Sequence, residues 1–253
     1  MPVPVIILRH GQSQWNVENR FTGWVDVPLT PQGEQEARQA GDLIRAKGLE
    51  VDLAFTSFLR RAAETCALVL NSLGQPNVPV QADWRLNERH YGALSGLNKS
   101  ETAAKYGEEQ VHLWRRSFSV RPNPMTPDHP HFIKADARYQ SAGLSVADMP
   151  VTECLADTVV RVQAFWNEKL LPCLKSGKRP LIAAHGNSLR ALLKLLANLS
   201  EDEVLRLNIP TAQPMVLEFN AQFELQSHQY LADPAVIEAA LAEVAQQGKA
   251  QPA

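Results

Sequence analysis

The sequence predicts an α/β protein, a three-layer sandwich in which helices flank both faces of a mostly parallel central sheet. Two observations predict this fold. Short apolar runs of strand length alternate along the chain with longer segments whose apolar residues recur at helical spacing. The chain also has 253 residues, 45% of them hydrophobic and 21% charged, which suits a globular protein with a sizeable core. No repeat or linker divides it, so we expect one domain spanning residues 1–253.

The first half supplies three strands and two helices. An apolar run at 3–8 predicts a buried strand, and Thr30 followed by Pro31 predicts the start of a helix that ends near Gly48. Residues 53–56 form the second predicted strand. Ser57 is expected to cap a helix with the apolar face Leu59, Ala63, Cys66 and Leu70. Residues 78–82 predict an edge strand, because Pro79 has no amide hydrogen to donate.

The second half begins with an irregular segment. Residues 117–150 are rich in proline and show little periodicity, which indicates a long excursion or lid. A long helix is then predicted from Leu155 to near Gly177, followed by a strand at 181–184, a helix with a leucine face and a final strand at 215–219. An alanine-rich tail, at about 232–253, is expected to be mobile.

Charge and composition exclude several classes of protein. The formal net charge of −2 predicts no affinity for nucleic acid or for an anionic membrane. The leucine-rich stretch 189–199 is interrupted by Arg190 and Lys194 and is shorter than the roughly 20 apolar residues that a membrane span needs. The three cysteines lack metal-site or CxxC spacing. We therefore expect a cytoplasmic protein with reduced thiols and no bound metal.

Cationic and imidazole groups follow three of the predicted strands. They are Arg9, His10 and Gly11 after the first, Arg60 and Arg61 after the second, and His185, Gly186 and Asn187 after the fourth. The carboxyl ends of parallel strands meet at one edge of a sheet, so these groups predict a compact positive pocket for a phosphoryl group. A single His-Gly pair more often marks a buried or capping histidine. Two such pairs together with Arg9 and Arg61 favour catalysis without a metal.

The motifs carry a family resemblance that runs from about Val5 to the tail. The segments Arg9–Gly11 with Ser13 and Asn16, Thr22–Trp24, and Ala184–Asn187 resemble the histidine phosphatase superfamily. Within that superfamily, the runs Leu86–Leu94, Gly96–Lys99, Trp114–Ser117 and Ile209–Thr211 resemble the cofactor-dependent phosphoglycerate mutases. Directly after the last run, Ala212 stands where these relatives usually have glycine, so the backbone there is expected to differ locally from theirs.

The resemblance implies a role for each matching residue. His10 would be phosphorylated, Glu88 would donate and accept the proton, and His185 would stabilise the transferring phosphoryl group. The residues implied to bind that phosphate are Arg9, Ser13, Asn16, Arg61, Gly186 and Asn187. Those implied to hold the rest of the substrate are Thr22, Gly23, Tyr91, Lys99, Arg115 and Arg116, and the same motif adds Arg89 and His90 as candidate contacts.

Chemistry sets conditions on these roles. His10 must attack through a neutral nitrogen, so its other nitrogen should donate to a backbone acceptor near Gly11. Adjacent helical residues point about 100° apart, so Arg115 and Arg116 can reach one ligand only near a helix end. Simpler interpretations are a salt bridge for Glu88, to Arg85 or Arg89, and a solvated basic pair for the two arginines.

The resemblance implies interconversion of 2-phosphoglycerate and 3-phosphoglycerate in glycolysis and gluconeogenesis. The reaction would pass through phosphohistidine, be primed by 2,3-bisphosphoglycerate, need no metal and occur in a homo-oligomer, a dimer or tetramer. One alternative is a phosphatase that acts on small phosphoesters. Another is a non-catalytic phospholigand-binding protein. Exclusion of water from the pocket distinguishes a mutase from a phosphatase, and the excursion and the tail are the candidate covers.

Overall fold

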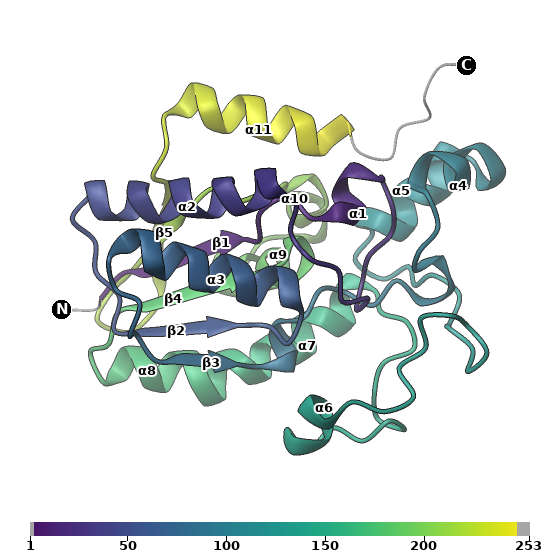
Figure 1. The fold of residues 1–253 in the computed structure, drawn as a ribbon, viewed down its shortest axis with the longest axis horizontal. Coiled ribbons are helices and arrows are strands. Elements are labelled where there is room, and N and C mark those ends of the chain that lie inside the picture. The colour runs from purple at the N-terminus through teal and green to yellow at the C-terminus, as the bar shows by residue number, and fades with distance from the viewer. Residues whose placement is uncertain (1–2, 247–253) are drawn as a thin grey trace.

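The computed structural model of the chain describes residues 3–246 and contains a six-stranded sheet in the order β3-β2-β4-β1-β5-β6 (Figure 1). The strands are β1 (Val5–Arg9), β2 (Leu53–Thr56), β3 (Val80–Ala82), β4 (Pro180–Ala184), β5 (Met215–Phe219) and β6 (Leu225–Tyr230). Strands β1 to β4 pair in parallel, whereas β5 and β6 are antiparallel to their neighbours. The predicted α/β class with a mostly parallel sheet is confirmed.

Helices cover both faces of this sheet. Helices α2 (Pro31–Ala46) and α3 (Arg60–Leu73) pack on one face, and α7 (Leu155–Phe165), α8 (Leu171–Lys175) and α9 (Gly186–Leu196) pack on the other. Beyond the carboxyl ends of the strands lie α1 (Gln14–Val17), α4 (Lys99–Tyr106) and α5 (Glu108–Arg116). The remaining elements are η1 (Trp84–Leu86), η2 (Gly92–Leu94), α6 (Ala137–Ser141), η3 (Trp166–Leu170), α10 (Glu201–Arg206) and α11 (Pro234–Gln246).

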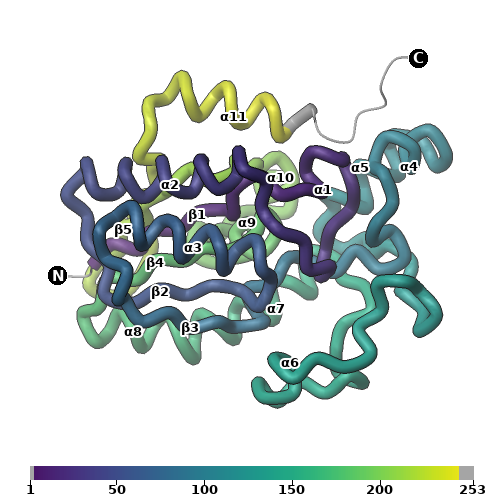
Figure 2. Tube along the Cα trace, viewed as in Figure 1, coloured from purple at the N-terminus to yellow at the C-terminus, as the bar shows by residue number. Residues whose placement is uncertain are grey.

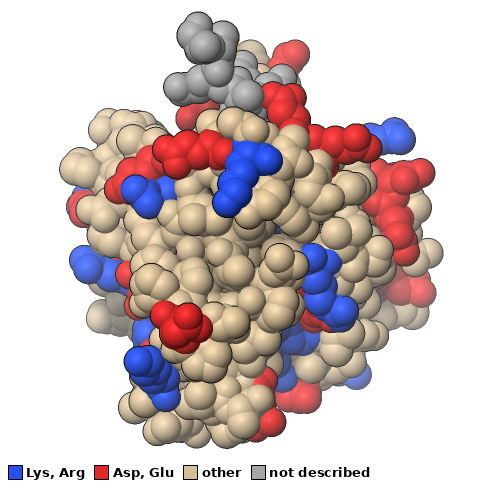
Figure 3. Space-filling model, turned by 90° about the vertical axis from the view of Figure 1, so that its right-hand side faces the viewer, with Lys and Arg blue, Asp and Glu red and all other residues tan. Residues whose placement is uncertain are grey.

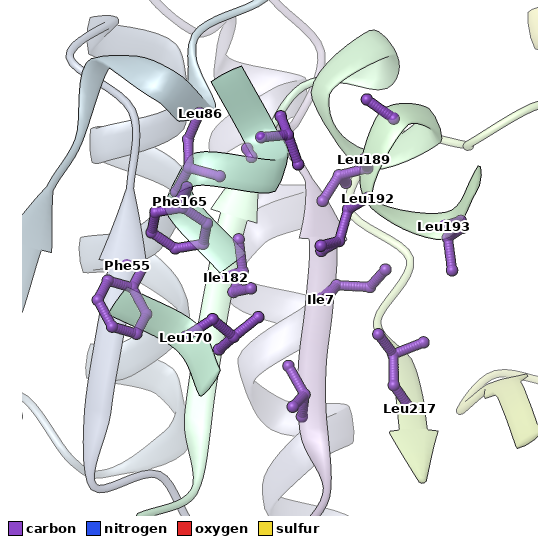
Figure 4. Packing of buried hydrophobic residues seen from close by; sticks show 14 of the residues in the cluster. Ile7, Phe55, Leu86, Phe165, Leu170, Ile182, Leu189, Leu192, Leu193 and Leu217 are labelled. Carbon is purple, nitrogen blue, oxygen red and sulfur yellow. The ribbon is translucent and has the colours of Figure 1, made fainter. Parts of the chain in front are cut away.

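The period-two alternation of a strand decides which core each residue joins. In β1, Val5 and Ile7 point toward the α7–α9 face, and Ile6 and Leu8 point toward α2 and α3. Figure 4 shows the first of these cores, where Ile7 and Phe55 of the sheet meet leucines of α9 and the ring of Phe165. Because both faces are covered, β4 and the part of β1 before Arg9 are uniformly apolar rather than alternating.

Several predicted elements differ from the structure. The long helix after Leu155 contains a π turn, η3, before Pro172, a residue that has no amide hydrogen to donate. Ala63, predicted on the apolar face of α3, is exposed, while Ala62 is buried in its place. Strand β6 was not predicted at all. Its sequence, LQSHQY, is polar and mostly exposed, so only pairing with β5 makes it a strand.

The excursion and the tail occupy different sides of the molecule. Figure 2 shows that residues 117–150 run as long loops around the short helix α6, away from the sheet. The tail contains helix α11, which lies over α2 and buries Ile237 and Val244. The end of the predicted mobile tail, 247–253, lies outside the described residues. Among helices of residues 3–246, none is long and apolar enough to span a bilayer.

Candidate active site

His10 stands immediately after β1, and the strand fixes its backbone. Its amide donates to Ala184 of β4 at 2.9 Å, which continues the ladder by one residue. The ring Nδ1 lies 2.7 Å from the Gly11 carbonyl, to which it donates, so the neutral ring keeps the lone pair on Nε2. Burial, followed by the charges of Arg61 and Arg9, lowers the pKa of His10 well below its usual value. His10 is therefore a neutral imidazole with a nucleophilic nitrogen, in the orientation predicted from its chemistry.

Glycine is required beside His10 by close packing. A Cβ on Gly11 would lie 2.2 Å from the carbonyl oxygen of Gly33, at the start of α2. The Gly11 amide also donates to Thr65 of α3 at 3.1 Å. The loop after β1 is thus held against two helices, and only glycine permits the backbones to approach this closely.

Two buried arginines flank His10. Arg61, in the first turn of α3, donates from Nε to Nε2 of His10 at 3.3 Å, and its other nitrogens bind the carbonyls of Gly23 and Val25. Burial lowers the pKa of Arg61 to about 10, which leaves it charged at neutral pH. Arg9 donates to the Ile209 carbonyl at 2.9 Å, while its buried Nε has no hydrogen-bond partner among the described residues. Both guanidinium groups can therefore contact an anion on His10.

Strand β4 delivers the second imidazole. The ring centroid of His185 lies 5.1 Å from that of His10. The Ser57 hydroxyl accepts from the amide of Leu59 and lies 2.7 Å from Nε2 of His185. Its hydrogen has no other acceptor among the described residues, so we assign it to Nε2, and the neutral ring then carries its own hydrogen on Nδ1, which is buried and has no partner among residues 3–246. Burial and the charge of Arg61 lower the pKa of His185 well below its usual value. This arrangement leaves a hydrogen-bond donor on the imidazole next to His10.

Glu88 provides the carboxylate of the site. Its Oε1 accepts from the amide of Arg89 at 2.7 Å and from the amide of Asn187, in the first turn of α9, at 3.2 Å. No described residue forms a salt bridge with it, so the predicted alternative of a pair with Arg85 or Arg89 is not seen: Arg85 pairs with Asp83 and Glu168 instead. Glu88 is thus held by backbone amides in the same pocket as His10, with its second oxygen able to bind a ligand.

A pocket joins these groups to a second set of cations. The described residues that line it are Arg9, His10, Asn16, Arg20, Thr22, Gly23, Arg61, Glu88, Tyr91, Lys99, Arg115, Arg116, Gly186, Asn187, Arg190, Ile209 and Val244. Lys99 begins α4, and Arg115 and Arg116 end α5, so the adjacent arginines do reach one cavity from a helix end. Of the described residues on the wall, Glu88 alone is acidic. The pocket is strongly positive although the chain is not.

The positive charge of the pocket is internal rather than a surface patch. Figure 3 views the molecule from the side of α4 and α5, and on this face basic and acidic groups are interspersed among a majority of uncharged residues. Burial, with the neighbouring charges of Arg115 and Arg9, lowers the pKa of Lys99 to about 7. Burial and Arg115 lower the pKa of Arg116 to about 10. Such crowded, desolvated cations favour a bound polyanion, which would restore their charge.

Four expected site residues lie behind the pocket wall instead of on it, and one of them is the fully buried His185. Ser13 is fully buried and donates to Oδ1 of Asn16, which itself faces the pocket. Arg89 is fully buried, donates to the Arg115 carbonyl and lies over the Tyr91 ring. His90 accepts from the Gly92 amide and faces a separate small cavity with Met125 and Phe132. Of these buried side chains, those of Ser13 and Arg89 bind residues that do line the pocket, Asn16 and Arg115.

Several residues that line or support the pocket were not predicted from the sequence. Ser57 was assigned only a capping role, yet it holds His185. Arg190 lines the pocket and fixes the Asn187 side chain at 2.8 Å, and its helical spacing of three residues from Asn187 was the available signal. Arg20, Ile209 and Val244 are also on the wall. Near Ile209, Ala212 has a left-handed φ of 48° and donates to the Arg9 carbonyl, a conformation that favours the glycine expected there.

Buried neutral histidines should make the protein sensitive to acid. His10 and His185 have strongly lowered pKa values, and burial lowers that of His90 to about 4. In the unfolded chain each ring takes up a proton near pH 6.5, so the unfolded state gains protons first. As the pH falls from 6.5 toward 4.5, the free energy of unfolding should drop by about 1.4 kcal/mol per pH unit for each ring.

Urea unfolding at pH 7.5, 6.5, 5.5 and 4.5 measures this slope. The variant His90→Gln, whose ring lies outside the pocket, should lose about one third of it and retain the rest. A free energy of unfolding that stays constant from pH 6.5 to 4.5 would contradict buried neutral rings.

The comparisons with known proteins agree on family and fold. The model of the histidine phosphatase superfamily (branch 1) matches residues 5–143. Similar solved structures include mycobacterial hydrolase 1, with a TM-score of 0.70 and 21% identity over 92% of this chain and 100% of that chain. Mycobacterial glucosyl-3-phosphoglycerate phosphatase in complex with VO3 has a TM-score of 0.68 and 22% identity over 90% and 97% of the two chains. A putative alpha-ribazole-5'-P phosphatase from Escherichia coli has a TM-score of 0.66 and 20% identity over 91% and 98%.

Proposed function

The chain belongs to the histidine phosphatase superfamily, and on that premise we propose that it interconverts 2-phosphoglycerate and 3-phosphoglycerate through a phosphohistidine at His10. The observation that carries the proposal is the second set of cations. Lys99, Arg115 and Arg116 share one pocket with His10 and Glu88. The phosphate of a simple phosphomonoester needs only the first set of cations, Arg9 and Arg61 beside His10. A phosphoglycerate carries a carboxylate as well, and a bisphosphoglycerate carries a second phosphate. A pocket with two cation sets suits these small polyanions.

Each half of the reaction uses the same residues. Nε2 of His10 attacks one phosphorus of the bisphosphoglycerate, the P–N bond forms, and the bond from that phosphorus to the glycerate oxygen breaks, which leaves a monophosphoglycerate. Glu88 donates a proton to the departing oxygen. In the return step the deprotonated Glu88 takes the proton from the free hydroxyl of a monophosphoglycerate, which attacks the phosphohistidine and forms the bisphosphate again. Arg9, Arg61 and His185 stabilise the negative charge that spreads over the phosphoryl oxygens during both transfers.

The residues present also fit the primer 2,3-bisphosphoglycerate. Two buried donors beside His10, Nε of Arg9 and Nδ1 of His185, have no hydrogen-bond partner in the part of the chain that the structure describes, and a phosphate would satisfy both. Lys99 and Arg116, whose pKa values burial has lowered, would hold the second phosphate. The primer supplies the phosphoryl group that converts His10 to its active form.

Phosphorus NMR of 3-phosphoglycerate in excess EDTA tests the proposal, with and without a catalytic amount of 2,3-bisphosphoglycerate. We expect 2-phosphoglycerate to appear, to depend on the bisphosphate and to be accompanied by little inorganic phosphate. Inorganic phosphate as the main product would overturn the mutase assignment in favour of a phosphatase.

A phosphatase that acts on small phosphoesters is the second candidate. The observation that favours it is the nature of the similar structures, which include a glucosyl-3-phosphoglycerate phosphatase and a putative alpha-ribazole-5'-P phosphatase. Their identity of 20–22% supports a shared fold and does not transfer a substrate. The same pocket would perform this reaction if water replaced the second hydroxyl.

Deleting residues 232–253 should move the enzyme toward phosphatase activity. Val244, near the end of α11, lines the pocket and is buried, so the deletion removes part of the wall and admits water. We expect the phosphoenzyme lifetime to shorten on the order of tenfold and the mutase rate to fall, as measured by alkali-quenched labelling and by NMR. Unchanged values for both would show that the tail does not exclude water.

A further inference from the structure

The carboxylate of Glu88 is carried by a segment with no regular structure. Residues 87–91 connect the two short 3₁₀ turns η1 and η2, so neither a helix nor a strand fixes their backbone. A general acid must nevertheless be held within a fraction of an ångström of its productive position. The structure must therefore supply the rigidity from outside this segment.

Arg161 of α7 supplies most of the hydrogen bonds that hold this segment in place. One of its terminal nitrogens, Nη1, donates to the carbonyls of Arg85 and Asn87 at 2.7 and 2.8 Å. The other, Nη2, donates to the carbonyl of Glu88 itself at 3.0 Å. The Glu88 carbonyl also accepts from the indole nitrogen of Trp24 at 2.6 Å. The backbone on both sides of the carboxylate is thus tied to one guanidinium group.

Glu153 completes the clamp from the other side of the segment. Its carboxylate accepts from Nε and Nη2 of Arg161 at 2.7 and 3.0 Å and from the amide of His90 at 2.7 Å. Its own amide donates to the His90 carbonyl at 2.8 Å. The side chains of Arg161 and Glu153 are only 6% and 4% exposed, so the pair is desolvated.

A buried ion pair is not required for stability, because its desolvation cost offsets much of its attraction. The Arg161–Glu153 pair instead fixes the position of the backbone that carries Glu88. The planar guanidinium presents donors in fixed directions to three carbonyls and one carboxylate at once, which a lysine ammonium cannot do. Neither Arg161 nor Glu153 is among the described residues that line the pocket. Their influence on the reaction must pass through the segment they hold.

We propose that Arg161, fixed by Glu153, is a positioning residue that aligns Glu88 for proton transfer to the leaving oxygen. The proposal rests on the proton-transfer role of Glu88 in the proposed function. It predicts a selective defect. Steps that need a proton on the leaving group should slow when Arg161 is changed, and steps that need none should not.

The substitution Arg161→Lys separates the two kinds of step. Phosphorylation of His10 by 2,3-bisphosphoglycerate expels an alkoxide that needs a proton, while phosphorylation by 2,4-dinitrophenyl phosphate expels a stable phenolate that needs none. Single-turnover rates with the first donor should fall about 10- to 100-fold, and those with the second by less than about threefold. The bisphosphate concentration for half-maximal rate should stay nearly constant, because the pocket lining is unchanged.

Glu88→Gln is the reference for this pattern and should show the same selective loss. The double variant Arg161→Lys with Glu88→Gln should be no slower than Glu88→Gln alone, because both changes remove one function. Arg179→Lys is the matched control. Arg179 also makes several ionic hydrogen bonds, to Asp52 and Glu50, but at the amino end of β4. It should leave both rates unchanged.

Equal losses with the two donors, or an unchanged rate with the bisphosphate, would overturn the role of Arg161. If Arg161→Lys does not fold, Glu153→Gln keeps the shape of the clamp, removes its charge and is expected to show a smaller defect of the same selectivity. Wild-type protein that forms no phosphohistidine with either donor would instead contradict the proposed function.

Discussion

Replacing His10 with glutamine should abolish formation of the phosphoenzyme and lower turnover by roughly 10⁴- to 10⁶-fold. No other described group beside the pocket combines a neutral lone pair with flanking guanidinium groups: Nε2 of His10 faces Arg61, while Nδ1 is committed to the Gly11 carbonyl. His185 cannot substitute, since it is fully buried behind the pocket lining and its Nε2 makes a short 2.7 Å bond with Ser57. Acid-labile, base-stable labelling with a radioactive phosphoryl donor measures the intermediate directly.

His228→Gln is the control for this prediction, because His228 is exposed on β6. It should label and turn over like the wild type. Labelling that persists in His10→Gln would move the nucleophile to another residue and would remove the basis of the proposed mechanism.

The second large effect is expected for His185→Gln, at about 10²- to 10³-fold. The ring places an unpartnered donor next to His10, and such a donor is worth most when charge develops on the phosphoryl oxygens. The loss should be equal for 2,3-bisphosphoglycerate and for 2,4-dinitrophenyl phosphate, since both transfers develop the same charge on phosphorus. Single-turnover phosphorylation of His10 by each donor measures it.

Ser57→Ala should show a weaker form of the defect expected for His185→Gln. It removes the hydroxyl that orients His185 but leaves the imidazole, so its loss should be smaller and again equal for the two donors. A loss in His185→Gln that is confined to the alkyl donor would assign the imidazole to proton transfer and not to charge stabilisation.

Much of the pocket was predictable because its residues follow strand ends. The order of strands and helices requires a parallel sheet, and a parallel sheet brings the carboxyl ends of β1, β2 and β4 together. His10, Arg61 and His185 therefore meet without any knowledge of distances. The tautomer of His10 was predictable for a similar reason, since an attacking nitrogen needs a free lone pair and the adjacent backbone offers the acceptor.

Residues on irregular segments were harder to place. Ser13, Arg89 and His90 belong to the motifs that carry the resemblance, yet their side chains turn away from the pocket. Neighbours in a loop do not share a fixed direction, so membership of a motif does not say which side chain faces the ligand. Arg190 and Ser57 show the converse, because they reach the site through contacts with residues that the sequence does not place beside them.

By itself, the sequence determined the class of fold, the edge of the sheet that holds the site and the residues able to do phosphoryl chemistry. These follow from local periodicity and from the geometry of parallel strands. Only the tertiary structure decided that the polar segment 225–230 is a strand and that Arg161 and Glu153 hold Glu88. Each of these depends on contacts between segments far apart in the chain. Burial and hydrogen bonding across such distances leave no periodic signal in the sequence.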